Sequence, residues 1–318
     1  MTASSSGKGN VCVCDVAARD GLQSEKRIWS VNERVELINR LANTGIQRIE
    51  AVSFVNPKRV PQMADAEKVM AQIERKADVR IAGLALNMKG VERALDAGVD
   101  EVRYVVVASE TFSQKNQGAS IAETMTGLES IAGRVKASGK VFSAVIGASF
   151  GCPFEGEVTT SAVVDIGIRL GALGVDEILL ADTIGCAVPS QVRERVGALQ
   201  SALEDSTAVG CHFHNTRNTG IANAVAAVES GVRILDASVG GIGGCPFAPR
   251  ATGNISTEDL VYVLRNMGYE TGIDLPQLID VAAWVEGYFD DPLPGQVMKA
   301  GLFPDDVIAR QAATSVQA

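Results

Sequence analysis

The sequence predicts a (β/α)8 barrel, an α/β fold in which a closed sheet of eight parallel strands lies inside a ring of helices. Eight short apolar segments alternate with helical segments over about 250 residues, as this fold requires. Several helical segments run into a glycine just past their last turn, at Gly45, Gly98, Gly174 and Gly231. The alternative is an open, doubly wound sheet. It would have fewer strands and a dinucleotide-binding glycine fingerprint after the first one, where this chain reads Ala17-Ala18-Arg19-Asp20-Gly21.

Local patterns give the expected order of the elements. The strands are expected over residues 11–16, 48–52, 79–84, 101–107, 141–148, 177–182, 209–212 and 234–239. The helices are expected over residues 31–43, 65–74, 89–96, 121–138, 161–173, 189–203, 219–229 and 257–268. The helix over 31–43 shows its pattern most clearly, because apolar side chains recur along it with the 3.6-residue period of an amphipathic helix.

The remaining segments lie at the two ends of the chain. Residues 1–10 are polar and rich in Ser and Gly, which predicts a disordered tail. Residues 274–318 follow the last barrel helix and are expected to form a short helical appendix. Since nothing between these ends has the composition of a linker, we expect a single catalytic domain over residues 11–318.

Composition excludes several classes of partner. The chain has 318 residues, of which 46% are hydrophobic, and a formal net charge of −9. This acidic balance argues against a nucleic acid or an anionic membrane as the partner. The polar start does not resemble a signal peptide, and no apolar run is long enough to cross a bilayer. We therefore expect a cytoplasmic protein whose six cysteines are reduced, and we also expect a homo-oligomer, dimeric or larger.

The only two histidines of the chain stand two residues apart, at His212 and His214. Val209, Cys211 and Phe213 around them fit a buried strand, in which residues i and i+2 point to the same face. The two imidazoles therefore aim at one place, which suits a divalent metal. Two packed or hydrogen-bonded histidines at the end of a strand are the alternative.

Other polar residues are expected at the same end of the barrel, where the chemistry of this fold is found. Asp20 follows the first strand, Glu50 lies near the end of the second, Asp182 ends the sixth, and Asn254 lies in the loop after the eighth. Barrel closure brings Asp20 and Asn254 beside the histidine pair. One carboxylate, two imidazoles and one amide oxygen suit Mg²⁺ or Mn²⁺, with Zn²⁺ and Co²⁺ as alternatives. Each acid could instead cap the helix that follows it.

A glycine-rich stretch with a cysteine follows the eighth strand over residues 240–246. Its glycines favour a mobile lid or a close approach to phosphate. Cys245 at the mouth of the barrel could act as an acid or a base on a substrate. The tetrapeptide Gly-Cys-Pro-Phe occurs over residues 151–154 and again over 244–247. We interpret Cys152 as structural and Cys245 as catalytic.

These motifs resemble those of the 3-hydroxy-3-methylglutaryl-CoA lyase family, metal-dependent lyases built on TIM barrels and related to isopropylmalate and homocitrate synthases. The resemblance runs from about residue 11 to residue 268. The similar blocks are Arg19-Asp20-Gly21-Leu22-Gln23-Ser24-Glu25-Lys26, Ile49-Glu50-Ala51-Val52-Ser53-Phe54, Gly151-Cys152-Pro153-Phe154-Glu155-Gly156, Ala181-Asp182-Thr183-Ile184-Gly185, Gly243-Gly244-Cys245-Pro246-Phe247-Ala248 and Thr252-Gly253-Asn254.

The resemblance implies a role for each matching residue. It implies a divalent metal, Mg²⁺ or Mn²⁺, bound by Asp20, His212, His214 and Asn254. It implies that catalysis involves Arg19, which would stabilise an enolate, and Cys245, supported by Glu50 and Asp182. Candidates for contact with the substrate or its CoA part are Gln23, Lys26 and Arg217, and Lys115 is a further candidate for a CoA phosphate.

The implied reaction is a retro-Claisen cleavage of 3-hydroxy-3-methylglutaryl-CoA to acetyl-CoA and acetoacetate. The metal would hold the carboxylate and the tertiary hydroxyl of the substrate and make that hydroxyl easier to deprotonate. The resulting alkoxide would expel the enolate of acetyl-CoA, whose charge Arg19 would offset.

One motif departs from the family pattern. The best-known lyases have Asp in place of Asn215 and a Tyr-Gly step in place of Arg217-Asn218. Arg217 could pair with a carboxylate or with a CoA phosphate. Because of the resemblance, we expect 3-hydroxy-3-methylglutaryl-CoA as the first choice of substrate. Because of the departures at Asn215 and Arg217, we keep a related thioester, such as citramalyl-CoA or a longer 3-alkyl analogue, as the second.

Two rival functions share part of these features. A Claisen-type condensing acyltransferase would share the barrel, the Arg-Asp-Gly motif and the His-x-His strand. Such enzymes lack the Gly-Gly-Cys-Pro loop and usually carry a regulatory domain for which this chain is too short. An inactive barrel that serves as a binding module would be expected to have lost Asp20, a histidine or Cys245, and all of these are present.

Overall fold

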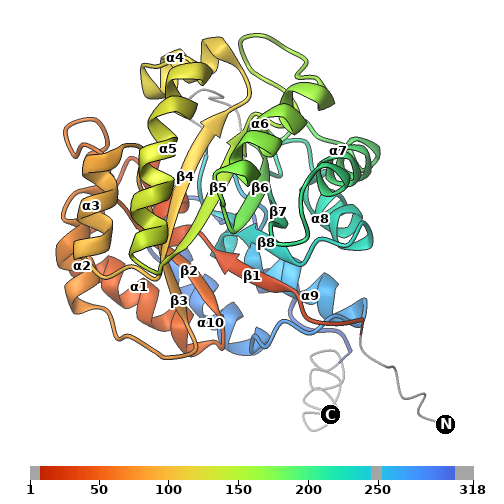
Figure 1. The fold of residues 1–318 in the computed structure, drawn as a ribbon. Helices are drawn as coiled ribbons and strands as arrows, with labels where there is room; N and C mark the ends of the chain where they lie inside the picture. Colours follow the sequence, from red (N-terminus) through yellow and green to blue (C-terminus); the bar gives the residue numbers. More distant parts are fainter. Residues whose placement is uncertain (1–7, 245–252, 305–318) are drawn as a thin grey trace, which may run out of the picture.

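The computed structural model describes residues 8–244 and 253–304 and shows a closed barrel of eight parallel strands. Neighbouring strands pair in chain order, and β1 pairs with β8 to close the sheet. The strands are β1 (Cys12–Asp15), β2 (Arg48–Ser53), β3 (Arg80–Leu84), β4 (Glu101–Val107), β5 (Val141–Gly147), β6 (Glu177–Asp182), β7 (Ala208–Phe213) and β8 (Ile234–Ala237). Figure 1 shows the helices arranged around the outside of this barrel. The predicted (β/α)8 barrel is therefore confirmed.

The helices follow the predicted order and differ from it mainly at their ends. They are α1 (Val31–Asn43), α2 (Ala66–Gln72), α3 (Met88–Asp96), α4 (Glu110–Gln117), α5 (Ile121–Ala137), α6 (Thr160–Ala172), α7 (Pro189–Ala202), α8 (Gly220–Glu229), α9 (Thr257–Asn266), α10 (Leu275–Glu286) and α11 (Val297–Ala300). Short turns form η1 (Ala17–Gly21), η2 (Pro61–Met63) and η3 (Val239–Gly241). Serine side chains fix several starts; at α1, Ser30 and Glu33 form a reciprocal capping box.

Helix α4 is absent from the prediction. It follows β4 closely, and Ser109 caps it by accepting the backbone N–H of Phe112 at 3.2 Å. Only Phe112 and Ser113 of this helix are buried, so its sequence carries little apolar periodicity.

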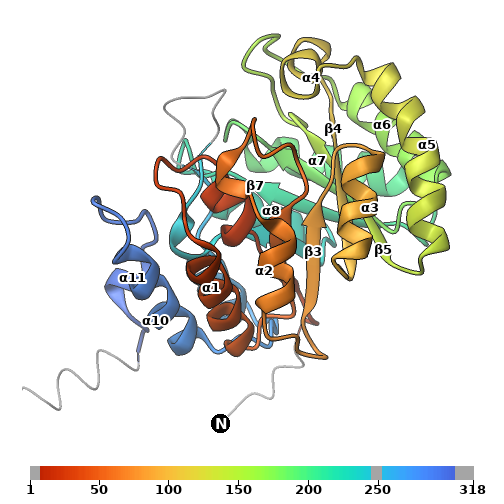
Figure 2. The same ribbon diagram turned by 90° about the vertical axis from the view of Figure 1, so that its left-hand side faces the viewer.

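The two ends of the described chain pack onto the barrel. Helices α10 and α11 form the predicted appendix, and α10 packs against α1 (Figure 2); residues 305–318 lie outside the described residues. Residues 1–7 of the predicted tail also lie outside the description. The backbone of residues 8–11 pairs with residues 268–270, including an N–H···O bond of 2.9 Å from Val11 to Glu270, so this part of the tail is held in place.

Two environments fill the interior. Between the barrel and the helices the core is apolar. Inside the barrel, many of the side chains that alternation turns inward are charged. The fully buried inward charges from the strands are Arg48, Glu50, Glu101, Arg103 and Asp236. A small apolar cluster around Val145, Leu179 and Ala181 accompanies them.

Helix α6 provides a test of which helical face holds the fold together. Leu170 is 0% exposed, whereas Ile168 on the same helix is 46% exposed. We predict that Leu170→Ala lowers the free energy of unfolding by about 2–5 kcal/mol, because it leaves a cavity in the core. Ile168→Ala, the matched control, should cost less than about 0.5 kcal/mol. Urea denaturation of both variants measures the difference, and equal losses would contradict the assigned face.

Candidate active site

A π-helical turn, η1, presents Arg19 and Asp20 directly after β1. The backbone N–H groups of Asp20 and Gly21 both donate to the carbonyl oxygen of Val16, at 2.7 and 3.1 Å. Single π-turns of this kind are frequent at functional sites. A Cβ on Gly21 would lie 2.7 Å from Cγ1 of Ile242, so glycine is needed for the segment after β8 to pack against this turn.

Asp20, His212 and His214 converge at the carboxyl-terminal end of the barrel. Oδ2 of Asp20 lies 4.0 Å from Nε2 of His212 and 3.9 Å from Nε2 of His214. One ligand atom from each residue lies within 4.8 Å of the other two, and all three side chains are buried. The strand alternation that predicted a common face for the histidines therefore holds.

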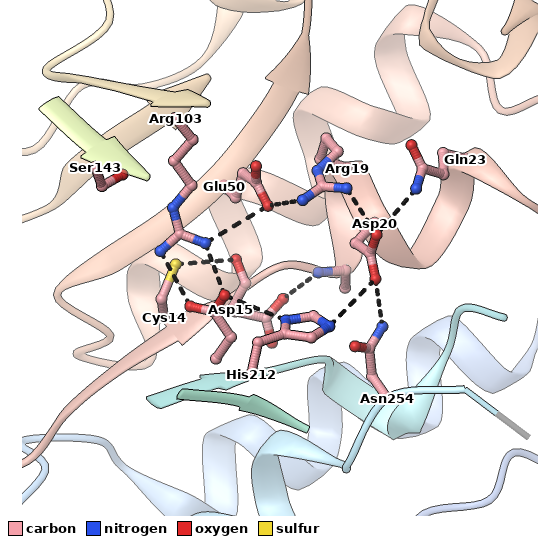
Figure 3. A network of polar contacts seen from close by, with 12 residues as sticks. Cys14, Asp15, Arg19, Asp20, Gln23, Glu50, Arg103, Ser143, His212 and Asn254 are labelled. Carbon is pink, nitrogen blue, oxygen red and sulfur yellow. Dashed lines mark hydrogen bonds and ion pairs between the residues drawn. The ribbon is translucent and has the colours of Figure 1, made fainter. Parts of the chain in front are cut away.

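Asn254 joins this cluster through a short stretch of backbone pairing. Residues 253–255 pair with the end of β7: Asn215 donates to Gly253 O at 2.8 Å, and Ile255 donates to Phe213 O at 3.1 Å. Nδ2 of Asn254 then donates to Oδ2 of Asp20 at 2.9 Å (Figure 3). This backbone pairing with the end of β7 places Asn254 beside Asp20, although the two residues are far apart in the sequence.

The residues present fit a divalent cation. Oδ1 of Asn254 is buried and has no hydrogen-bond partner among the described residues. It therefore offers an unused acceptor beside one carboxylate and two imidazoles. This donor set of oxygen and nitrogen atoms suits Mg²⁺, Mn²⁺ or a related divalent ion.

Arg19 is held firmly by two carboxylates. Its Nη1 donates to Oδ1 of Asp20 at 2.7 Å, and its Nη2 donates to Oε2 of Glu50 at 2.6 Å (Figure 3). Its Nε is buried and has no hydrogen-bond partner in the described part of the chain. Gln23 supports the same carboxylate, since its Nε2 donates to Oδ1 of Asp20 at 2.9 Å. Glu50 and Gln23 thus touch the cluster, as positioning partners of Arg19 and Asp20.

Two residues that the sequence analysis did not single out lie behind His212. Oδ2 of Asp236 is 3.2 Å from Nδ1 of His212. Arg103 donates two hydrogen bonds to the same carboxylate, from Nη1 to Oδ2 at 2.8 Å and from Nη2 to Oδ1 at 3.0 Å. In the sequence, the feature that could have identified Asp236 and Arg103 is a charged residue at an inward position of an apolar strand, because a buried charge is costly unless it is paired.

The electrostatics favour a neutral histidine and an ionised aspartate. Burial lowers the pKa of His214 to about 4, and His212 adds to this shift, so His214 is neutral at pH 7 with a free lone pair. Burial would raise the pKa of Asp20, but Arg19, the two histidines and the hydrogen bond from Asn254 together outweigh burial and hold that pKa below its usual value. Burial lowers the pKa of His212, yet the hydrogen bond to Asp236 and the charge of Asp20 raise it overall. An ionised Asp20 and a neutral His214 are the forms of these side chains that bind a cation.

Four other predicted residues have different surroundings. Both carboxylate oxygens of Asp182 accept backbone N–H groups, from Cys186 at 2.8 Å and from Ala187 at 3.0 Å, so Asp182 holds the loop after β6. Arg217 is exposed and donates to the carbonyl oxygens of Ile184 and Gly185 in this loop. Lys26 is exposed, and Lys115 lies 5.0 Å over the ring of Phe154.

The two cysteines of the repeated tetrapeptide differ. Cys152 is buried, and its Sγ lies 3.0 Å from Oγ of Ser109 and accepts the N–H of Phe154 at 3.3 Å. These contacts agree with a structural role. Cys245 lies outside the described residues. Before it, the carbonyl of Gly244 accepts the hydroxyl of Ser24 at 3.2 Å, which holds the start of the glycine-rich stretch beside the η1 turn.

A cavity of about 920 Å³ opens at the opposite end of the barrel, where the strands begin. Arg48, Arg80 and Glu177 are among its lining residues. Their charges are already paired, for instance by the 3.1 Å contact between Arg80 and Glu177. We place the active site at the other end, where the Asp20 cluster lies and where this fold carries its chemistry.

Comparison with known proteins shows the family of the chain. A family model described as HMGL-like matches residues 10–285. The (R)-citramalyl-CoA lyase of Chloroflexus aurantiacus is 44% identical over 301 residues, covering 92% of this chain and 95% of that protein. A hydroxymethylglutaryl-CoA lyase of Bacillus subtilis is 37% identical over 286 residues, covering 90% of this chain and 95% of that protein.

Solved structures of similar proteins indicate the same family. The structure of a hydroxymethylglutaryl-CoA lyase from Acinetobacter baumannii, in complex with coenzyme A and 3-methylmalate, superposes with a TM-score of 0.89 at 39% identity. The match covers 96% of this chain and 98% of that one. Since both the family model and these relatives span nearly the whole barrel, the chain belongs to the HMGL-like family of carbon–carbon lyases.

Proposed function

We propose that this chain catalyses a divalent-metal-dependent retro-Claisen cleavage of a 3-hydroxyacyl-CoA and releases acetyl-CoA. The observation that carries the proposal is the convergence of Asp20, His212 and His214 at the carboxyl-terminal end of the barrel. The relatives support the thioester, because they are named as CoA lyases and one is solved with coenzyme A. The cytoplasmic location and the homo-oligomer stay predictions.

Asp20, His212, His214 and Asn254 would hold the metal, which we propose to be Mg²⁺ or Mn²⁺. When bound, the ion would supply Lewis-acid polarisation of the hydroxyl and the carboxylate of the substrate. The protein contributes a buried pocket in which Asp20 is ionised and His214 is neutral, so that both act as ligands without first losing a proton.

In the proposed reaction the hydroxyl on C3 loses its proton and the C2–C3 bond breaks. The electron pair of that bond passes to the thioester as an enolate, and C3 becomes a ketone. Arg19 is suited to stabilise the enolate oxygen, because Asp20 and Glu50 fix its guanidinium while Nε remains an unused donor among the described residues. Protonation of C2, for which we propose Cys245, gives acetyl-CoA.

The substrate is the finer part of the proposal. In citramalyl-CoA the carboxylate is attached to C3 itself, whereas one methylene separates the two in 3-hydroxy-3-methylglutaryl-CoA. The sequence motifs alone favour the latter. The relative at 44% identity is named as a citramalyl-CoA lyase, and the chain departs from the best-known lyases at Asn215 and Arg217. Together these support citramalyl-CoA as the preferred substrate, with 3-hydroxy-3-methylglutaryl-CoA second.

We predict a strict divalent-metal requirement. Asp20→Ala and His212→Ala should abolish turnover, because each removes a ligand from the cluster. Elemental analysis and acetyl-CoA release measure the effect, with Asp274→Ala, a change in the cap of α10, as a control that should retain turnover. Full activity of the wild type after exhaustive chelation, with the preparation free of metal, would refute the requirement.

We predict that Cys245 carries chemistry and Cys152 does not. Cys245→Ala should lower kcat about a hundredfold, which is typical of a lost acid–base group. Cys152→Ala removes a buried thiol bonded to Ser109 and should mainly lower stability. Steady-state kinetics and thermal unfolding of both variants separate the two roles. A normal kcat in Cys245→Ala together with a lost kcat in Cys152→Ala would assign the chemistry to the other loop.

We predict a higher kcat/KM for citramalyl-CoA than for 3-hydroxy-3-methylglutaryl-CoA. If Arg217 takes part in this choice, Arg217→Ala should reduce the ratio of the two values, whereas Lys26→Ala should lower both in proportion by weakening CoA binding. Competition between the two thioesters measures the ratio directly. Preference for the glutaryl substrate would restore our first sequence-based choice, and an unchanged ratio in Arg217→Ala would show that Arg217 only braces the loop after β6.

A further inference from the structure

We propose that Arg103 and Asp236 form a positioning pair that fixes the orientation and the tautomer of the metal ligand His212. The inference rests on the proposed metal site. Neither residue touches the cluster of ligand atoms directly; Asp236 acts on His212, and Arg103 acts on Asp236.

The contact between Asp236 and His212 decides which imidazole nitrogen faces the metal. Nδ1 of His212 lies 3.2 Å from Oδ2 of Asp236, while Nε2 points to Asp20. An ionised carboxylate can only accept, so it selects the tautomer with the proton on Nδ1. The lone pair is then on Nε2, on the side of Asp20 and His214. A carboxylate behind a metal-binding imidazole commonly has this effect.

Arg103 holds Asp236 in turn by a fork of two hydrogen bonds, at 2.8 and 3.0 Å. Its Nε donates to Oε1 of Glu101 at 3.0 Å, and its Nη1 lies 3.7 Å from Oε2 of Glu50. All of these side chains are buried inside the barrel. The guanidinium is therefore tied to three strands, β4, β8 and β2, and leaves the Asp236 carboxylate one orientation.

The contacts continue around the site and return to Arg103. Glu50 also binds Arg19, and Arg19 binds Asp20. Figure 3 shows the contacts that lead from Arg103 through Glu50, Arg19 and Asp20 to His212. Lysine cannot replace the planar fork, because its single ammonium cannot bind both carboxylate oxygens in the same plane. The orientation of the His212 imidazole should therefore depend on the planar shape of the Arg103 guanidinium as well as on its charge.

The chain offers a matched control at the other end of the barrel. Arg48 is 1% exposed and Arg103 is 0% exposed, and both lie on inward positions of strands. Arg48 pairs with Glu101 and Glu177, away from the histidines. A purely structural role for Arg103, as one more buried ion pair, predicts that Arg103→Lys and Arg48→Lys behave alike.

The experiment titrates metal-free full-length protein with Mn²⁺ and follows the free ion by electron paramagnetic resonance. Arg103→Lys and Asp236→Asn should each bind Mn²⁺ about 10–100-fold more weakly than the wild type. Arg48→Lys should bind Mn²⁺ within about threefold of the wild type, even where its melting temperature falls by as much as that of Arg103→Lys. Visible spectra of the Co²⁺-loaded proteins should change in the first two variants and stay unchanged in the third.

Several outcomes would overturn the proposed positioning role of Arg103 and Asp236. Wild-type Mn²⁺ affinity in a folded Asp236→Asn would show that the carboxylate does not position His212. Equal losses of affinity in Arg103→Lys and Arg48→Lys would reduce Arg103 to a structural ion pair. If Arg103→Lys does not fold, Asp236→Asn decides alone, since it keeps the size of the side chain. Failure of the wild type to bind Mn²⁺ or Co²⁺ at all would refute the proposed metal site itself.

Discussion

Compensation of charge inside the barrel is the constraint on which the site depends. Alternation along the strands turns Arg48, Glu50, Glu101, Arg103 and Asp236 inward, where water cannot reach them. A buried charge that loses its partner is strongly destabilising, so each of these residues restricts the position of the next. The Arg103 guanidinium holds the pKa of Asp236 well below its usual range despite burial. The site at the carboxyl-terminal end is therefore supported from beneath by fixed charges.

Close backbone approach is the second requirement, because Asp20 and Asn254 come from opposite ends of the chain. Gly253 has φ +96°, and a Cβ there would lie 1.5 Å from the carbonyl oxygen of Gly243. A Cβ on Gly243 would lie 2.8 Å from Nδ2 of Asn254. These two glycines let the segment after β8 fold back over η1, which puts the Asn254 amide against Asp20. The glycine-rich stretch thus assembles the site as well as leading to Cys245.

Sequence reasoning found the fold and the common face of the two histidines because both follow from periodicity. Eight alternating elements define the barrel, and the i, i+2 rule places His212 with His214. It missed the Asp236–Arg103 pair because it treated inward charges as ordinary strand residues, although Glu101 and Arg103, two positions apart, carry the same signal as the histidines. It missed α4 because that helix buries little. Asp182 does not cap α7, because it binds the backbone N–H groups of Cys186 and Ala187, which precede the N-cap residue Val188; these loop contacts depend on backbone geometry that no local pattern reveals.

The architecture separates the groups proposed for bond cleavage from those proposed for substrate choice. Asp20, His212 and Arg19 are buried and fixed by several contacts each, so a substitution there disturbs the whole charged interior. Arg217 and Lys26 are exposed on loops whose changes cost little stability. Relatives named for citramalyl-CoA and for hydroxymethylglutaryl-CoA can therefore share this barrel at similar overall identity. The proposed choice of acyl group therefore also rests on the loop residues Asn215 and Arg217, at which this chain departs from the best-known lyases.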